Sequence, residues 1–240
     1  MVSVVTLAID TSAGISVSVV GPDEVVTESN PSNRQHAELL APLIERALGR
    51  AEVLPSDVTR VVVGTGPAPF TGLRAGLVAA RTFAFARGIP VFGVCSLDAV
   101  ALRAARSLAL PTGTRLLVLA DARRKEVYGR RYLVESVDDG TFGAIGVDEA
   151  RVLARDGSAF VERPSALTDV DATVVVTAGP LPVLGDVVQV DADNCTLEAG
   201  LLASIARDDL AAGAELACDP LYLRRPDAQV PTQAKRSAGA

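Results

Sequence analysis

A carboxylate stands at the end of each of two apolar runs in this sequence. Asp10 follows the run at residues 4–9, and the hydroxyl side chains of Thr11 and Ser12 come directly after it. Asp121 closes a second run of the same kind. A carboxylate at the end of a buried strand is well placed to hold a magnesium ion beside a nucleotide phosphate. These two positions are therefore the first candidates for chemistry.

The turns beside both carboxylates lack most of what a phosphate-binding turn needs. The turn after Asp10 has one glycine, Gly14, and residues 122–125 after Asp121 read Ala-Arg-Arg-Lys, with none. Phosphates are held by backbone amides that glycines leave uncovered. We therefore predict that the Asp10 turn is a degenerate nucleotide site without ATP hydrolysis of its own. An ATPase or kinase that uses Asp10 stays as the alternative.

Residues 64–74 form a glycine-rich segment that superficially resembles a phosphate loop. The segment has no Gly-Lys-Ser/Thr, and Pro67 and Pro69 remove two backbone donors. Its composition fits a rigid strand-to-helix elbow, with Thr71 as the expected cap of a helix that runs to about Arg87.

The helix after this elbow is thin along much of its length, because its small residues leave the backbone uncovered. Leu73, Leu77 and Phe83 add apolar area. Another helix could approach such a surface closely, but the composition alone slightly favours packing within the chain. The small residues are Gly72, Ala75, Gly76, Ala79, Ala80 and Ala84.

The sequence offers weak nucleophiles and no metal framework. His36 is the single histidine, so one copy of the chain cannot build a two-histidine site. Cys95, Cys195 and Cys218 form no CxxC pair, and Cys95 is interpreted as a buried structural cysteine. Since there is also no Gly-x-Ser-x-Gly elbow, a glycoprotease-like peptidase is the weakest alternative.

The bulk composition narrows the class of protein. The formal net charge is −6 over 240 residues, which argues against a large phosphate-binding surface. Two short basic runs, at residues 123–125 and 224–225, are interpreted as solvated turns. No apolar stretch approaches the roughly 20 residues of a membrane span, and the N-terminus does not resemble a signal peptide. We expect a cytoplasmic protein.

The hydrophobic pattern predicts strands separated by helices, which indicates an α/β fold with mixed sheets. One short helix is expected within residues 140–165. The other expected helices cover residues 36–48, 71–87, 96–107 and 197–207. The expected strands are at residues 4–9, 15–19, 25–27, 61–63, 91–94, 116–120, 127–134 and 174–176.

The strand that ends in Asp10 and the strand that ends in Asp121 are each followed by an alternating strand. This weak internal repeat predicts a duplicated fold of the actin, hexokinase and Hsp70 (ASKHA) type. We expect one subdomain at residues 1–108 and a second at 109–224, whose last element packs back on the first. Residues 225–240 are expected to form a flexible tail.

Several segments along the chain resemble the bacterial TsaB (YeaZ) family. The most specific is GTGPAPFTGLRAGL at 64–77, where the family has a signature close to GPGSFTGLR. Ala68-Pro69 stands where that signature has Gly-Ser. The others are LAIDTS at 7–12, RQHAELLAPLIERAL at 34–48, GIPVFGVCSLDAVA at 88–101, DARRKEVYGRRY at 121–132 and PLYLRRPDA at 220–228.

The resemblance implies an actin-like fold without catalytic residues or metal. It implies a heterodimer with TsaD, the enzyme that makes N6-threonylcarbamoyladenosine at position 37 of tRNAs reading codons that begin with A. TsaE joins that complex, and TsaC supplies threonylcarbamoyl-AMP. The isolated chain would bind no cofactor, with ATP or ADP entering only at the level of the complex. The chain would touch tRNA only through that complex, and alone it would pair with itself.

The resemblance also implies which face binds the partner. That face would be formed by the helix at 36–48 and the helix at 71–87. Its residues would be His36, Leu39, Leu40, Leu43, Ile44, Phe70, Thr71, Leu73, Arg74, Leu77 and Ala80.

Overall fold

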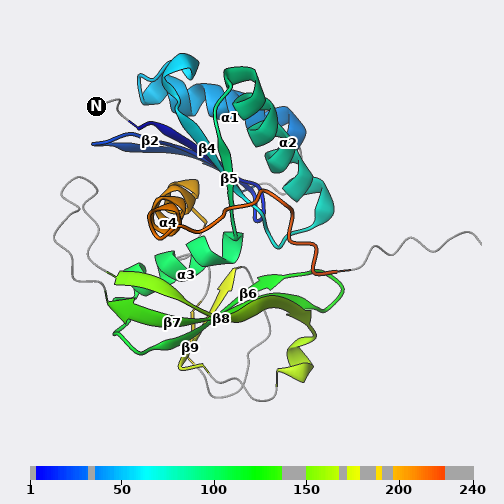
Figure 1. The fold of residues 1–240 in the computed structure, drawn as a ribbon. Helices are drawn as coiled ribbons and strands as arrows, with labels where there is room; N and C mark the ends of the chain where they lie inside the picture. Colours follow the sequence, from blue (N-terminus) through cyan, green and yellow to red (C-terminus); the bar gives the residue numbers. More distant parts are fainter. Residues whose placement is uncertain are drawn as a thin grey trace, which may run out of the picture.

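The protein folds into two five-stranded sheets with helices against them (Figure 1). The computed structural model describes residues 4–31, 36–136, 150–167, 172–178, 188–190 and 197–224. The expected tail at 225–240 and Cys195 lie outside these residues.

The first sheet has the strand order β3-β2-β1-β4-β5. β1 runs antiparallel to β2 and parallel to β4, because a short turn joins β1 to β2 whereas a helix crosses over from β3 to β4. The strands are β1 (Thr6–Asp10), β2 (Ile15–Val20), β3 (Val25–Asn30), β4 (Arg60–Gly64) and β5 (Val91–Val94).

The second sheet repeats this arrangement with the order β10-β9-β6-β7-β8. β6 is antiparallel to β7 and parallel to β9, as β1 is to β2 and β4. The strands are β6 (Arg115–Asp121), β7 (Val127–Ser136), β8 (Ala150–Glu162), β9 (Val174–Ala178) and β10 (Val188–Val190). The predicted duplicated α/β fold is confirmed, and Asp10 and Asp121 end equivalent strands.

The helices form two layers, one outside the first sheet and one between the sheets. α1 (His36–Arg50) and α2 (Phe70–Arg87) cover the outer face, whereas α3 (Ser96–Ser107) and α4 (Ala199–Ala211) pack between the two sheets (Figure 1).

The side chains of β1 alternate between these two layers. Leu7 and Ile9 pack in the core cluster under α1 and α2, whereas Ala8 belongs to the cluster around α3 and α4. α4 therefore contacts the first sheet although it follows the second in sequence. The subdomain boundaries expected from the sequence stay predictions.

Several details differ from the sequence-based expectations. The N-cap of α2 is Pro69 and not the expected Thr71, and the N-cap of α3 is Cys95. Ser96, the first residue of α3, donates its hydroxyl to Asp10. Of residues 140–165, where one short helix was expected, 140–149 lie outside the described residues, and 150–162 form β8, paired along β7. Two 3₁₀ turns, Pro55–Asp57 and Pro164–Ala166, complete the described elements.

The last described residues, 216–224, form a strap that returns across the first sheet (Figure 1, orange). Gly93 N donates to Leu216 O at 3.1 Å, and Leu221 N donates to Thr65 O at 2.9 Å. The guanidinium of Arg224 then reaches the turn between β6 and β7. The strap therefore links the end of the first sheet to the second.

Within the part of the chain that the structure describes, no helix combines the length and the apolar character that crossing a membrane requires.

Candidate functional site

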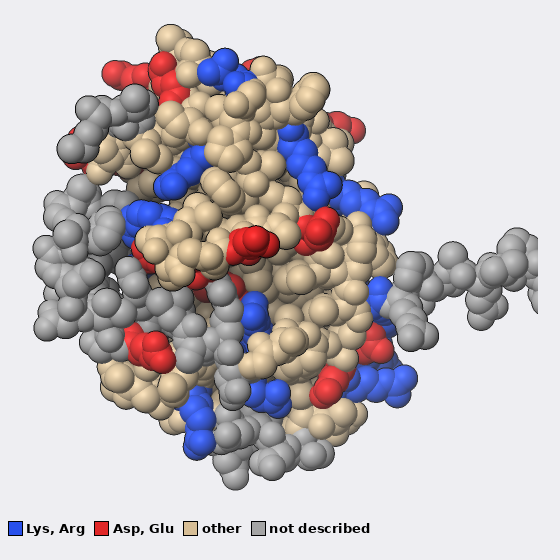
Figure 2. All heavy atoms as spheres, viewed as in Figure 1, with Lys and Arg blue, Asp and Glu red and all other residues tan. Residues whose placement is uncertain are grey.

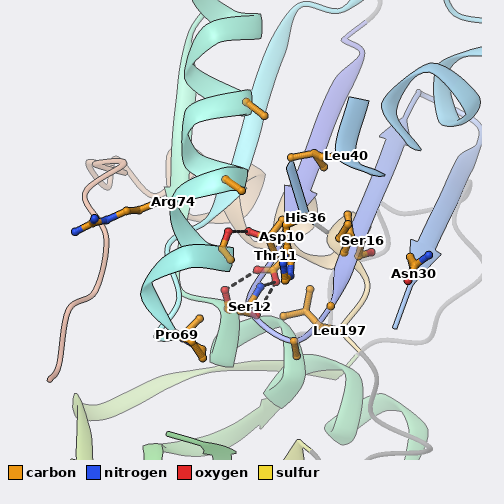
Figure 3. Close-up of a pocket in the computed structure, with 18 of the residues that line it drawn as sticks. Asp10, Thr11, Ser12, Ser16, Asn30, His36, Leu40, Pro69, Arg74 and Leu197 are labelled. Carbon is orange, nitrogen blue, oxygen red and sulfur yellow. Dashed lines mark hydrogen bonds between the residues drawn. The ribbon is translucent and has the colours of Figure 1, made fainter. Parts of the chain in front are cut away.

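One cavity of about 1580 Å³ runs from the turn after β1 to the space between α1 and α2. Its inner end is lined by the Asp10 turn, the start of α3 and the end of β6. Its outer end is lined by the facing sides of α1 and α2. Figure 3 shows Asp10, Thr11 and Ser12 at the inner end, with His36 and Leu40 of α1 beside them.

Both oxygens of the Asp10 carboxylate accept hydrogen bonds from the chain itself. Oδ1 accepts from the backbone N of Ser12 at 2.7 Å and from Ser12 Oγ at 2.5 Å. Oδ2 accepts from Ser96 Oγ at 2.5 Å, and Ser96 in turn accepts from Gly66 N at 3.1 Å. The carboxylate therefore ties the β1 turn to the start of α3.

Glycine at position 64 is required by this carboxylate. A Cβ atom there would lie 1.8 Å from Asp10 Oδ2 and 2.7 Å from Ser96 Oγ, far inside van der Waals contact. The glycine-rich appearance of residues 64–74 thus has a structural cause at its first position: it makes room for a side chain and not for a phosphate.

Burial raises the pKa of Asp10 above its ordinary value of 3.8, and the hydrogen bonds from Ser12 and Ser96 offset part of that rise. Only 2% of the residue is exposed. A magnesium ligand needs free carboxylate oxygens directed at the ion, and these oxygens are already bonded within the fold. Among the described residues no group of three or more His, Cys, Asp or Glu is placed to hold a metal ion.

The equivalent turn after β6 is filled by side chains. Arg123 N donates to Asp121 Oδ1 at 2.7 Å, and the Arg123 guanidinium lies 3.2 Å from Asp121 Oδ2. Arg123, Arg124 and Lys125 all have positive φ, a conformation that glycine adopts most easily. Glycines here would leave the backbone amides uncovered, whereas these three residues carry long side chains. Asp121, like Asp10, is thus hydrogen-bonded by residues of its own turn.

The bare face of α2 packs inside the chain. A Cβ at Gly76 would lie 2.4 Å from Thr11 Oγ1, and one at Gly72 would lie 3.0 Å from Thr11 O and 3.2 Å from the imidazole of His36. Thr11 Oγ1 donates to Gly72 O at 2.8 Å. The two glycines admit the β1 turn and the start of α1, as the composition had slightly favoured.

Five of the residues expected to bind a partner lie in the monomer's own core. Their side chains pack between the helices and the first sheet, so little of each is accessible to a partner that docks on this conformation. They are Leu40, Leu43, Leu73, Leu77 and Ala80, each at most 4% exposed, and of these Leu40 lines the cavity. Their part in binding a partner stays a prediction. His36 is 9% exposed, and its Nε2 has no hydrogen-bond partner among the described residues.

The remaining expected residues lie at the surface or near it. Leu39, Ile44 and Phe70 are half-buried, and Thr71 and Arg74 are exposed. Of these, Ile44, Thr71 and Arg74 line the cavity. No observation on this chain alone tests whether they touch a partner.

The outer end of the cavity is an apolar groove that sequence reasoning missed. On each helix the residues that line the groove come one to three positions after a buried residue, so they form a second stripe beside the buried one. This helical spacing could have located the groove from the sequence. Val78, 63% exposed, is its most accessible apolar side chain. We call it the α1–α2 groove, lined by Ala37, Ala41 and Ile44 of α1 and by Ala75, Val78, Ala79, Thr82, Phe83 and Ala86 of α2.

Cys95 is a buried residue and not a nucleophile. Burial raises the pKa of its thiol to about 12, so the thiol stays protonated at neutral pH. The polar group next to it joins α3 to the second sheet: Asp98 of α3 accepts from Arg130 at 3.0 Å and from the Tyr132 hydroxyl at 2.8 Å, both on β7. The expectation of a structural cysteine is confirmed.

The family model for TsaD, tRNA N6-adenosine threonylcarbamoyltransferase, matches residues 28–156, more than half of the chain. The solved structure of YeaZ from Pseudomonas aeruginosa superposes with a TM-score of 0.71 at 28% identity, covering 92% of this chain and all of that one. TsaB proteins also match in sequence: that of Escherichia coli is 32% identical over 127 residues, 52% of this chain and 54% of its own length.

The chain belongs to the TsaB (YeaZ) family. A further member, the TsaB of Bacillus subtilis, is 30% identical over 128 residues, again about half of each chain. An uncharacterized protein of Mycobacterium tuberculosis is 36% identical over 229 residues, which cover 93% of both chains. The resemblance read from the motifs is confirmed, and the relatives named TsaB are described as tRNA threonylcarbamoyladenosine biosynthesis proteins.

Proposed function

We propose that this protein is a non-catalytic subunit that binds a TsaD-type enzyme and activates it in the synthesis of N6-threonylcarbamoyladenosine. The modified base would be adenosine 37 of tRNAs that read codons beginning with A. The α1–α2 groove is the observation that carries this proposal, because it is the exposed apolar surface nearest the degenerate site. Membership in the TsaB family supports the reaction and the partner.

The state of Asp10 supports a non-catalytic role. Its oxygens are held by Ser12 and Ser96, and its burial raises its pKa. A catalytic carboxylate in this position would direct an oxygen at the cation that accompanies a nucleotide, whereas both Asp10 oxygens bond to side chains of the protein. The protein instead uses Asp10 to fix the turn against α3.

The shape of the groove supports docking by a helix. Alanines line much of both walls, so a partner helix can approach the backbones closely, and Val78 and Phe83 supply apolar area to bury. The occupant we propose is a helix of the TsaD-type enzyme. Self-association through the same groove is the competing occupant when that enzyme is absent, and a TsaE-type ATPase would join only the assembled complex.

Reconstitution tests this function. The chain is added to TsaC-, TsaD- and TsaE-type proteins of its own organism with a tRNA transcript, and the modified nucleoside is measured by mass spectrometry. We expect the amount of modified nucleoside to fall about tenfold or more when the chain is omitted. A loss of about 1.4 kcal/mol in binding free energy already corresponds to a factor of ten.

Two outcomes would contradict the proposal. One is full modification in the mixture that lacks this chain. The other is ATP turnover by the chain alone that disappears in Asp10→Ala, which would establish the ATPase alternative instead.

A further inference from the structure

The turn between β6 and β7 holds three consecutive cations in an unusual backbone conformation. Arg123, Arg124 and Lys125 have φ values of 63°, 55° and 62°, in the left-handed region that side chains with a Cβ rarely adopt. The turn is closed by Ala122 N donating to Glu126 O at 3.0 Å and Glu126 N donating to Arg123 O at 3.1 Å. All three cationic side chains are exposed as a result.

An aromatic and arginine stack lies at the N-terminal end of α2. The rings of Phe70 and Tyr222 have centroids 4.9 Å apart, and the Arg74 guanidinium lies 5.6 Å and 5.5 Å from the two centroids. Arg74 Nε also donates to the Tyr222 hydroxyl at 2.8 Å. Tyr222 is 41% exposed, and Figure 3 shows Arg74 pointing away from Asp10 toward the strap.

The strap joins this stack to the cationic turn. Two residues after Tyr222, the Arg224 guanidinium donates to Ala122 O at 3.1 Å and to Glu126 Oε2 at 2.6 Å. Figure 2 shows Lys and Arg gathered along this side, over α2 and where the described chain ends, with single acidic groups between them. We call this surface the basic edge; it consists of Phe70, Arg74, Arg123, Arg124, Lys125, Tyr222 and Arg224.

The basic edge adjoins the α1–α2 groove along α2. Arg74, Val78 and Arg81 are spaced four and three residues apart and so share one face, and Arg74 itself lines the cavity. Arg74 and Arg81 also contact the strap, through Tyr222 and the carbonyl of Cys218. Arg124 and Lys125 of the β6–β7 turn do not line the cavity, so a partner helix in the groove leaves these two cations accessible.

We propose that the basic edge binds RNA, with the β6–β7 turn on the phosphate backbone and the Phe70–Arg74–Tyr222 stack against an unpaired base. Cations on an exposed turn pair with phosphates, and aromatic rings beside a guanidinium provide a stacking surface for a base. An acidic protein surface would also pair with the cations of the turn, but it would have no use for the aromatic stack. The edge is a local departure from the chain's formal charge of −6.

This inference rests on the proposed function and deepens it, because it gives this chain a direct share of the contact with tRNA. The test uses the complex of the full chain with its TsaD-type partner and an unmodified tRNA transcript. Arg124→Asn combined with Lys125→Asn removes two cations and keeps a residue that tolerates the left-handed region. The matched control is Arg46→Gln with Arg50→Gln, two exposed arginines of α1 that pair with Glu28 on the edge strand β3 and are not part of the basic edge.

The tRNA dissociation constant is measured over a series of salt concentrations. We expect the turn variant to bind about tenfold more weakly and to lower the salt slope by about 1–2, since each lost phosphate contact removes about 0.9 from it. The control should change affinity by less than about twofold. A photo-crosslinking residue at position 222 should react with tRNA, whereas one at Phe85, 89% exposed on α2, should not.

Co-elution of each variant with the partner separates the two proposals. If the complex forms but affinity and salt slope stay unchanged in the turn variant, the RNA contact is wrong while the docking function stands. Equal losses of tRNA affinity in the turn variant and in the control would also overturn the RNA contact. So would a turn variant that still binds tRNA normally but no longer binds an acidic protein that the wild type binds. Failure of the wild-type chain to form the complex would count against the proposed function itself.

Discussion

Asp10 shows how a residue that looks catalytic in the sequence becomes structural in the fold. Its position after a buried strand could be predicted, because strand and turn are encoded locally. Its hydrogen bond to Ser96 could not, since the two residues are 86 positions apart and meet only when β1 and α3 are packed together. The requirement for glycine at position 64 has the same long-range origin.

The raised pKa of Asp10 predicts a specific dependence of stability on pH. Because the folded state binds this proton more tightly than the unfolded state, ionisation of Asp10 costs stability at neutral pH, and that cost falls as the pH drops through the folded pKa toward 3.8. Asp10→Asn carries no such cost at any pH. The wild type should therefore gain stability relative to Asp10→Asn on acidification, as measured by urea unfolding of both proteins at neutral pH and near pH 5. A difference between them that stays constant, or that moves the other way, would contradict the buried, satisfied carboxylate.

At the scale of elements, α2 is the informative case. Its extent to Arg87 was predictable from the pattern of small and apolar residues, and Gly88 ends it with φ of 64°. Which face it buries was only weakly predictable, because the composition of small residues favours internal packing over a docking surface by a small margin. Contacts from Thr11 and His36, distant in sequence, decide for internal packing. Leu73 and Leu77, which the family resemblance assigned to a partner, pack in the core.

Gly76→Ala tests this packing directly. The new methyl group would meet Thr11 Oγ1 at 2.4 Å, and overpacking of this kind costs about 1–3 kcal/mol, against up to about 1 kcal/mol gained in helix propensity. We expect a net loss of about 1–2 kcal/mol in the free energy of unfolding. Gly49→Ala is the matched control on α1, where nothing lies within 4 Å of the added Cβ, and it should be neutral or stabilising. Equal effects of the two substitutions would show that Gly76 has no packing role.

At the scale of the molecule, the duplication could be predicted because each strand–Asp–hairpin unit is written in a short stretch of sequence. The placement of α4 between the sheets and the return of residues 216–224 across the first sheet depend on contacts over long distances. These late segments bring Tyr222 and Arg224 beside residues from both halves. The groove and the basic edge are therefore properties of the assembled fold and not of any one motif.

The central claim is that the α1–α2 groove binds a TsaD-type enzyme, and complex formation measures it most directly. Substitutions at Leu43 or Leu77 would unfold the core, so the test uses Val78→Asp, at an exposed position that lines the groove. Phe85→Asp is its control, since Phe85 is exposed on the same helix but does not line the cavity.

We predict that the wild type and Phe85→Asp bind the partner with similar dissociation constants in size-exclusion and titration experiments. Val78→Asp should weaken binding by about a hundredfold, because a charge buried in an apolar interface without a partner costs several kcal/mol. Val78→Asp that keeps its fold and binds the enzyme as tightly as the wild type would contradict the account.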